Sequence, residues 1–205
     1  MRREFHVRFC EGEGVRFPLA TRLIVLVDPK HPRGDWLRKA VGRRLREELV
    51  KLQVEINEEK TRNVDLAAGE NFDFLGFRFQ RRRSQRGKWW PCYEPVPAKR
   101  TELVRKLKEI FRRYRSQPVA RVIEIINPIL RGWVNYFRMG HARRCFAYVR
   151  LWVEKKIRRH LMRSRGRRGF GWKRWSTPWL HANLGLFRGY KTVRLQPRAK
   201  ALPCT

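Results

Sequence analysis

The charge of this chain is concentrated in its second half, and that concentration limits how the chain can fold. Residues 81–205 contain 34 Lys and Arg against 5 Asp and Glu, whereas residues 1–80 contain 16 against 13. A net charge of this size opposes compact packing unless apolar contacts or a bound polyanion offset it. Because 42% of all residues are hydrophobic, a packed core remains possible. The sequence therefore predicts a folded protein whose partner is a nucleic acid.

Three stretches of the basic half carry apolar residues at helical spacing. Ser116-Gln117-Pro118 separates the first from the second, and Gly140 ends the second before a third runs to about residue 162. Asn127-Pro128 resembles an N-cap followed by a first helical proline, so it predicts a restart or a kink there. The expected apolar stripes are Leu103, Leu107, Ile110, Phe111 and Tyr114; Ile129, Trp133 and Phe137; and Val149, Val153, Ile157 and Leu161.

The first half has a mixed pattern of strands and one helix. Residues 23–27 are continuous and β-branched, which predicts a buried strand, and a helix is expected from Asp35, as N-cap, to about Leu52. Residues 54–56 alternate like a strand, 57–62 form a charged connection, and 72–79 alternate again around Gly76. Residues 1–18 show no clear period. The predicted class is α+β, with short strands and one helix before a three-helix domain.

A boundary is expected after residue 80. Residues 81–88 form a basic turn, and Trp89-Trp90 with three nearby prolines predicts that regular structure stops there. Residues 164–171 are rich in Gly and Arg, which predicts a flexible basic loop that could become ordered on RNA. The expected organisation is 1–80, a junction at 81–97, a helical domain at 98–163, and a basic Arg, Gly and Trp-rich tail at 164–205.

Composition argues against a metalloprotein, a secreted protein and a membrane protein. The four cysteines are far apart and form no zinc pattern, and His141 with Cys145 makes only half of a metal site. No signal peptide opens the chain, and the longest apolar run is too short to span a bilayer. We expect no metal ligands, no cofactor and no membrane, and a location inside a bacterium or organelle, in the cytoplasm or its equivalent.

Two groups of motifs resemble a known family. Residues 54–61 (Val-Glu-Ile-Asn-Glu-Glu-Lys-Thr) and 72–77 (Phe-Asp-Phe-Leu-Gly-Phe) resemble the last two palm blocks of group II intron reverse transcriptases. Residues 127–138 (Asn-Pro-Ile-Leu-Arg-Gly-Trp-Val-Asn-Tyr-Phe-Arg), with Gly140-His141, resemble the maturase-specific domain of that family, which forms the thumb. The resemblance implies a partial palm followed by a thumb that binds intron RNA and template-primer duplex.

The resemblance also indicates what is missing. In this family a Tyr-Ala-Asp-Asp hairpin precedes an apolar strand and supplies carboxylates for two metal ions. Here residues 19–22 are Leu-Ala-Thr-Arg, so Arg22 would oppose Mg²⁺ where a ligand belongs. We expect no polymerase activity from this chain alone, and Mg²⁺ binding only if another chain completes the site.

The candidate RNA contacts are polar side chains with one glycine among them. Arg131, Asn135 and Arg138 share a face of one predicted helix, and the third helix concentrates positive charge that repels itself unless RNA compensates it. Trp133, Tyr136 and Phe137 are expected to be mostly buried. The full set is Lys60, Arg62, Gly76, Arg131, Asn135, Arg138, Arg143, Arg144, Lys155, Lys156, Arg158 and Arg159.

The predicted function is RNA binding in support of group II intron splicing. Two alternatives remain open: a fragment of an RNA-directed DNA polymerase that is active only with its missing N-terminal half, and a general basic RNA-binding protein. A decayed reading frame would also fit the absence of the aspartates.

Overall fold

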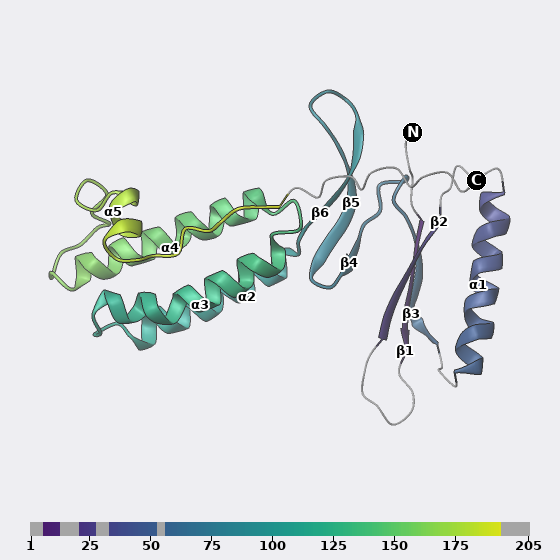
Figure 1. Cartoon of the computed structure of the whole chain (residues 1–205), viewed down its shortest axis with the longest axis horizontal. Helices are drawn as coiled ribbons and strands as arrows, with labels where there is room; N and C mark the ends of the chain where they lie inside the picture. The colour runs from purple at the N-terminus through teal and green to yellow at the C-terminus, as the bar shows by residue number, and fades with distance from the viewer. Residues whose placement is uncertain (1–5, 13–20, 28–32, 53–55, 194–205) are drawn as a thin grey trace, which may run out of the picture. The chain divides into compact units, whose positions relative to one another are not determined.

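The computed structural model of the chain describes residues 6–12, 21–27, 33–52 and 56–193 (Figure 1). The chain divides into two compact units. The first comprises Met1–Phe72 and Phe79–Pro91, and the second comprises Asp73–Arg78 and Cys92–Thr205. Strands dominate the first unit and helices the second, so the predicted α+β class is confirmed.

The first unit contains an antiparallel sheet with the strand order β2-β1-β3. Its strands are β1 (His6–Gly12), β2 (Thr21–Val27) and β3 (Asn57–Asp65). The strand expected at 23–27 is confirmed, but it lies at the edge of the sheet and Leu26 is 56% exposed, so the expectation of a buried strand was wrong for this residue. The prediction for 57–62 was wrong, because these residues begin β3 and pair with β1, whose strand was not recognised either. Pairing with a central strand outweighs the poor strand propensity of Asn, Glu and Lys.

Helix α1 (Gly34–Lys51) contacts β2 in the same unit. Its N-cap is Arg33 rather than Asp35, because the first helical hydrogen bond runs from the Leu37 amide to the Arg33 carbonyl at 2.8 Å. Salt bridges on its outer face, such as Arg44 to Glu48 at 2.9 Å, support the helix. The expected end near Leu52 is confirmed.

The second sheet is made of two consecutive hairpins with the order β4-β5-β6. Its strands are β4 (Phe72–Phe74), β5 (Phe77–Arg83) and β6 (Trp89–Pro95). Leu75 and Gly76, with φ of 48° and 76°, form the two-residue turn between β4 and β5, as type I′ turns require. The expectation that regular structure stops at Trp89 was wrong. β6 is an edge strand of this sheet, a position in which a proline such as Pro91 is tolerated.

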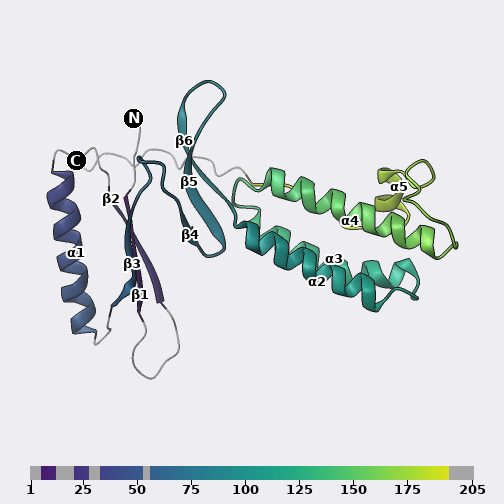
Figure 2. The same cartoon turned by 180° about the vertical axis from the view of Figure 1, so that it is seen from behind.

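Three helices pack together in the second unit, as Figures 1 and 2 show. They are α2 (Pro97–Arg113), α3 (Val119–Phe137) and α4 (Arg143–Arg163), and each contacts the other two. The stripes predicted on α2 and α4 are confirmed as contact surfaces. On α3 the prediction holds only in part, because Phe137 is buried but Ile129 and Trp133 are partly buried at the margin of the buried face. The helical residues buried in the main core cluster are Leu103, Leu107, Phe111, Val122, Ile123, Ile126, Leu130, Val149, Val153 and Ile157.

Helix α3 runs through Pro128 without a break. Asn127 is therefore not an N-cap. Its side chain instead donates to the Gly185 carbonyl at 2.8 Å and accepts from the Phe187 amide at 2.9 Å. The polar side chain before the proline binds a later segment of the chain to α3.

Residues 175–186, which lie in the segment expected to be a basic tail, form part of the core. Ser176 caps the short helix α5 (Thr177–Ala182) by accepting from the Trp179 amide. Trp175, Leu180 and Leu186 are at most 3% exposed and complete the cluster formed by the three helices. The expectation of a basic tail rested on the many Arg and Gly residues of this region and did not take account of its buried apolar residues.

Candidate nucleic-acid interface

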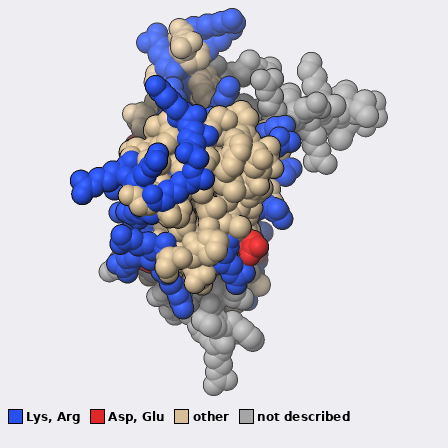
Figure 3. Space-filling view, turned by 90° about the vertical axis from the view of Figure 1, so that its left-hand side faces the viewer, with Lys and Arg blue, Asp and Glu red and all other residues tan. Residues whose placement is uncertain are grey.

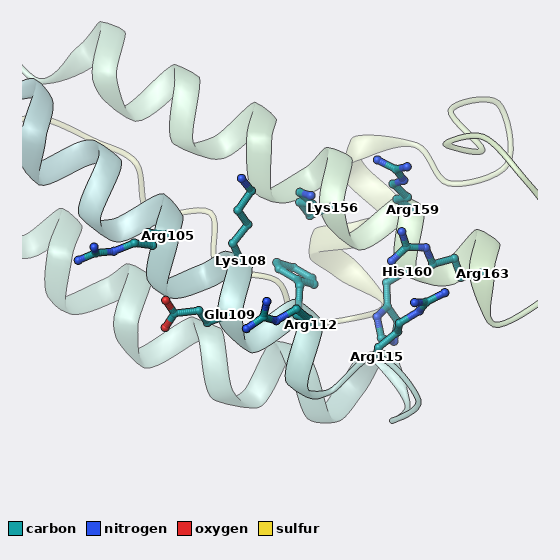
Figure 4. Close-up of a pocket in the computed structure, with 10 residues that line it drawn as sticks. Arg105, Lys108, Glu109, Arg112, Arg115, Lys156, Arg159, His160 and Arg163 are labelled. Carbon is teal, nitrogen blue, oxygen red and sulfur yellow. The ribbon is translucent and has the colours of Figure 1, made fainter.

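A basic groove lies between α2 and α4 and has a cavity volume of about 520 Å³. Figure 4 shows that both helices contribute side chains to it, and that Lys108 extends from α2 toward α4. We call this cavity the α2/α4 groove. Its lining residues are Arg105, Lys108, Glu109, Phe111, Arg112, Arg115, Lys156, Arg159, His160 and Arg163.

The electrostatics of the α2/α4 groove favour a bound anion. Glu109 is the only acidic residue among those that line it. Burial lowers the pKa of Lys156, and the neighbouring cations Arg159, Lys108 and Arg163 lower it further. A phosphate group would relieve this repulsion, because an opposite charge close by stabilises the ammonium form. The groove therefore has the chemistry of a phosphate-binding site.

His160 braces one end of the groove. It is 6% exposed, and its Nε2 lies 2.9 Å from the Gln117 carbonyl, to which the ring donates in the matching tautomer. This bond joins α4 to the turn between α2 and α3, close to Arg115. Backbone atoms and a buried ring, rather than flexible side chains alone, thus set the width of the groove at this end.

One predicted RNA contact, Arg158, must be corrected. It is 1% exposed, and its Nε donates to the Trp175 carbonyl at 2.8 Å. Its remaining nitrogens contact the Glu154 carboxylate at 3.4 Å and the Thr177 hydroxyl at 2.9 Å, and that hydroxyl donates to Glu154 at 2.8 Å. A buried charge requires such partners. Arg158 holds the segment after α4 in place and does not reach the surface.

The other predicted contacts on α4 lie in two groups. Arg143 and Arg144 are exposed in the first turn, which contains no acidic residue and no side-chain cap. Positive charge is unfavourable at a helix N-terminus, so a bound anion would stabilise this end too. Lys156 and Arg159 line the α2/α4 groove, whereas Lys155 is exposed beside it.

The predicted contacts on α3 do not line the groove. Arg131 and Asn135 are exposed on α3, and Arg138 is exposed immediately after it. Phe137 is buried and Trp133 partly buried, as expected. Tyr136 corrects the expectation for the aromatic residues, because it is 53% exposed and its hydroxyl donates to the Leu75 carbonyl at 2.8 Å.

The candidates in the strands and hairpin have different surroundings. Arg62 is exposed on β3, and the side chain of Lys60 lies outside the described part of the chain. Gly76 faces its own unit: a Cβ there would lie 3.5 Å from the Phe137 ring, and its carbonyl accepts from the Val96 amide. Helix α3 thus packs close to Gly76, and the predicted approach of a nucleic-acid backbone to the same glycine stays a prediction.

Sequence reasoning missed most of the α2 side of the groove. Arg105, Lys108, Arg112 and Arg115 follow one another at intervals of three and four residues, which places them on one helical face. The sequence also contains a signal for the buried ion pair of Glu154 and Arg158, because Glu154 is the only acidic residue after Glu124. Neither the spacing on α2 nor the isolated Glu154 is distinctive in a region that contains 34 Lys and Arg residues.

The surface of the second unit is dominated by positive charge. Figure 3 views the side that lies to the left in Figure 1, and nearly all charged side chains visible there are Lys or Arg. Within the described residues, no cluster of His, Cys, Asp and Glu could hold a metal ion. No helix in the described ranges is both long enough and apolar enough to cross a membrane.

The helical unit is similar to a known protein family. Residues 100–178 match the family described as "Group II intron, maturase-specific domain". This range covers most of α2, all of α3 and α4, and the buried pair Glu154 and Arg158. No curated protein matches the chain. A domain of this family implies a role in group II intron splicing and binding to intron RNA. The chain therefore contains a group II intron maturase-specific domain, and the α2/α4 groove belongs to it.

Proposed function

We propose that the chain binds folded group II intron RNA through the α2/α4 groove and stabilises the RNA that performs its own splicing chemistry. The observation that carries the proposal is the set of cations around the partly buried Lys156, whose repulsion a phosphate would relieve. Arg143 and Arg144 extend the positive surface to the other end of α4. No catalytic residue is needed for this role.

We also propose that the chain has no polymerase activity alone. What supports this is the sequence Leu19-Ala20-Thr21-Arg22, which offers no carboxylate where the family places two aspartates. Incubation of the purified chain with template-primer, nucleotides and Mg²⁺ should give no extension. Extended primer would refute this part of the proposal and leave the RNA-binding part intact.

The central test measures affinity for a folded group II intron RNA and for an unrelated structured RNA of equal length across a salt series. Tighter intron binding that survives salt better than the control is expected, because shape-specific contacts add to counterion release. Equal affinities that fall together with salt would contradict a maturase role and support the alternative of a general basic RNA-binding protein.

Paired substitutions connect that test to the α2/α4 groove. The groove variant is Lys108→Ala with Arg112→Ala, and the matched control is Lys99→Ala with Arg121→Ala, two cations that are ion-paired with Glu102 and Glu124. Both remove two charges. The groove variant should flatten the salt dependence by about one unit for each phosphate that it no longer neutralises, and the control by much less. Equal effects would refute the groove as the site.

A second candidate function rests on the first unit. Trp36, Val50 and Leu52 are 59–72% exposed on or just after α1, and exposed apolar surface often marks a binding site. This favours association with a separate chain that carries the rest of a polymerase palm and its aspartates. Co-purification with such a fragment, and primer extension only by the mixture, would support it. A monomeric chain with an inactive mixture would reject it.

A further inference from the structure

The loop that follows α4 carries two neighbouring aromatic rings near the α2/α4 groove, of which Trp172 is exposed and Phe170 is half-buried. Phe170 and Trp172 lie with their ring centroids 6.2 Å apart. Trp172 is 51% exposed, whereas the next tryptophan, Trp175, is 3% exposed and Trp179 packs against the core. We call Phe170 and Trp172 the aromatic platform. Most of the aromatic side chains of this segment complete the fold, but Trp172 does not.

Cations of α4 hold the inner side of the aromatic platform. The guanidinium of Arg158 lies 4.2 Å from the centre of the Trp172 ring, and the Lys155 amine lies 4.7 Å from that of Phe170. Arg158 is buried and held by hydrogen bonds, so the face of the indole that it contacts is permanently covered. The exposed area of Trp172 therefore belongs to the rest of the ring, where a second flat group can stack.

The backbone holds the platform in place. Gly169 and Gly171 have φ of 101° and 62°, a region that other residues rarely adopt. A Cβ on Gly171 would lie 2.5 Å from the Trp175 ring, and the Trp175 amide donates to the Gly171 carbonyl at 3.0 Å. The part of the 164–171 loop nearest Trp172 is thus fixed by packing rather than left flexible. A platform that is formed before binding loses less entropy when a ligand stacks on it.

Arg159 connects the platform to the groove. It lines the α2/α4 groove, as Figure 4 shows, and its guanidinium lies 5.7 Å from the centre of the Phe170 ring. We propose that the aromatic platform is a subsite for an unpaired nucleobase of the RNA whose phosphates occupy the groove. The proposal rests on the RNA-binding function above and adds the substrate class: a bulged or single-stranded nucleotide next to structured RNA. Stacking on an aromatic side chain is the usual way in which proteins hold such bases.

The experiment uses the full chain and two hairpin RNAs of identical charge. One carries a single bulged adenosine, and the other carries an abasic nucleotide at the same position. The wild-type chain should prefer the bulged adenosine by roughly 5- to 150-fold, the range expected when one base stacks on an aromatic side chain. Trp172→Ala should abolish the preference, and Trp89→Ala, which removes a tryptophan that is 46% exposed in the first unit, should keep it.

Two further variants separate stacking from structure. Trp172→Phe retains an aromatic face and should keep part of the preference, whereas Trp172→Leu fills space without one and should lose it. Thermal unfolding of each variant reports whether the contact with Arg158 still supports the fold. A wild-type chain that binds both hairpins equally overturns the platform, and so does Trp172→Ala or Trp172→Leu with a full preference. If intron RNA is still preferred over the unrelated RNA, only the platform fails and the proposed function stands.

Discussion

Replacement of the buried Arg158 should destabilise the second unit strongly. Arg158→Met removes the donors to the Trp175 carbonyl, the Thr177 hydroxyl and the Glu154 carboxylate. Glu154 is 2% exposed, and its Oε1 has no hydrogen-bond partner among the described residues, although Arg150 Nε and His181 Nε2 lie 3.8 and 3.5 Å from it. Arg158→Met removes the fully buried cation beside this carboxylate, and breaking a buried pair of this kind costs about 3–5 kcal/mol. This is a large share of the roughly 5–15 kcal/mol by which a folded domain is stable.

The assay is thermal unfolding of the full chain, followed by calorimetry and by the near-ultraviolet signal of the tryptophans. For a unit of this size the loss corresponds to a fall in Tm of roughly 10–20 °C. The double variant Glu154→Leu with Arg158→Met removes the uncompensated charge as well, and should be more stable than Arg158→Met alone. A loss of less than about 1 kcal/mol in the single variant, or a double variant no more stable than it, would refute the reasoning.

Two smaller predictions concern the same unit. Gly140→Ala should lower Tm, because the added Cβ would lie 2.8 Å from Phe77 and 2.9 Å from the Tyr93 carbonyl. Gly132→Ala, whose Cβ would meet nothing within 4 Å inside α3, should raise the free energy of unfolding by about 0.5–1 kcal/mol. A Gly140→Ala variant more stable than Gly132→Ala would contradict this packing. Burial and neighbouring cations lower the pKa of Lys156 in the free protein, and a bound phosphate should raise it again. Between these two pKa values RNA should bind with uptake of a proton, and its affinity should fall as the pH rises through this range. Calorimetry in two buffers of different ionisation enthalpy measures this uptake, which Lys156→Arg should reduce; no difference between the two proteins would reject it.

The helical half was the most predictable part of the chain. The stripes that include Leu107 and Val153 repeat every three to four residues over long segments, and such periodicity specifies a buried helical face regardless of the residues around it. The prediction of a helix start at Asn127-Pro128 was wrong, because the same dipeptide also occurs inside a helix. The Asn127 side chain donates to the distant Gly185 carbonyl instead of capping a helix, and the local sequence does not indicate this partner.

What the sequence could not predict depends on contacts between distant residues. β3 forms because β1 lies beside it, although its own residues favour a turn. The α2/α4 groove could be predicted only in part. The density of charge on α4 indicates Lys156 and Arg159, but the sequence does not indicate which face of α2 lies opposite them. Arg158 looked like its basic neighbours, and nothing in the local pattern indicates that one arginine among them points inward.

The contribution of residues 175–186 to the core affects the order in which the protein can fold during synthesis. Helices α2 to α4 leave the ribosome before Trp175, Leu180 and Leu186, so their shared apolar surface stays open until the last of these emerges. At a translation rate of about 5–20 residues per second, that interval lasts on the order of a few seconds. In a cell such an intermediate exposes apolar surface to proteases and chaperones. An RNA that binds it early would act as a folding partner as well as a ligand.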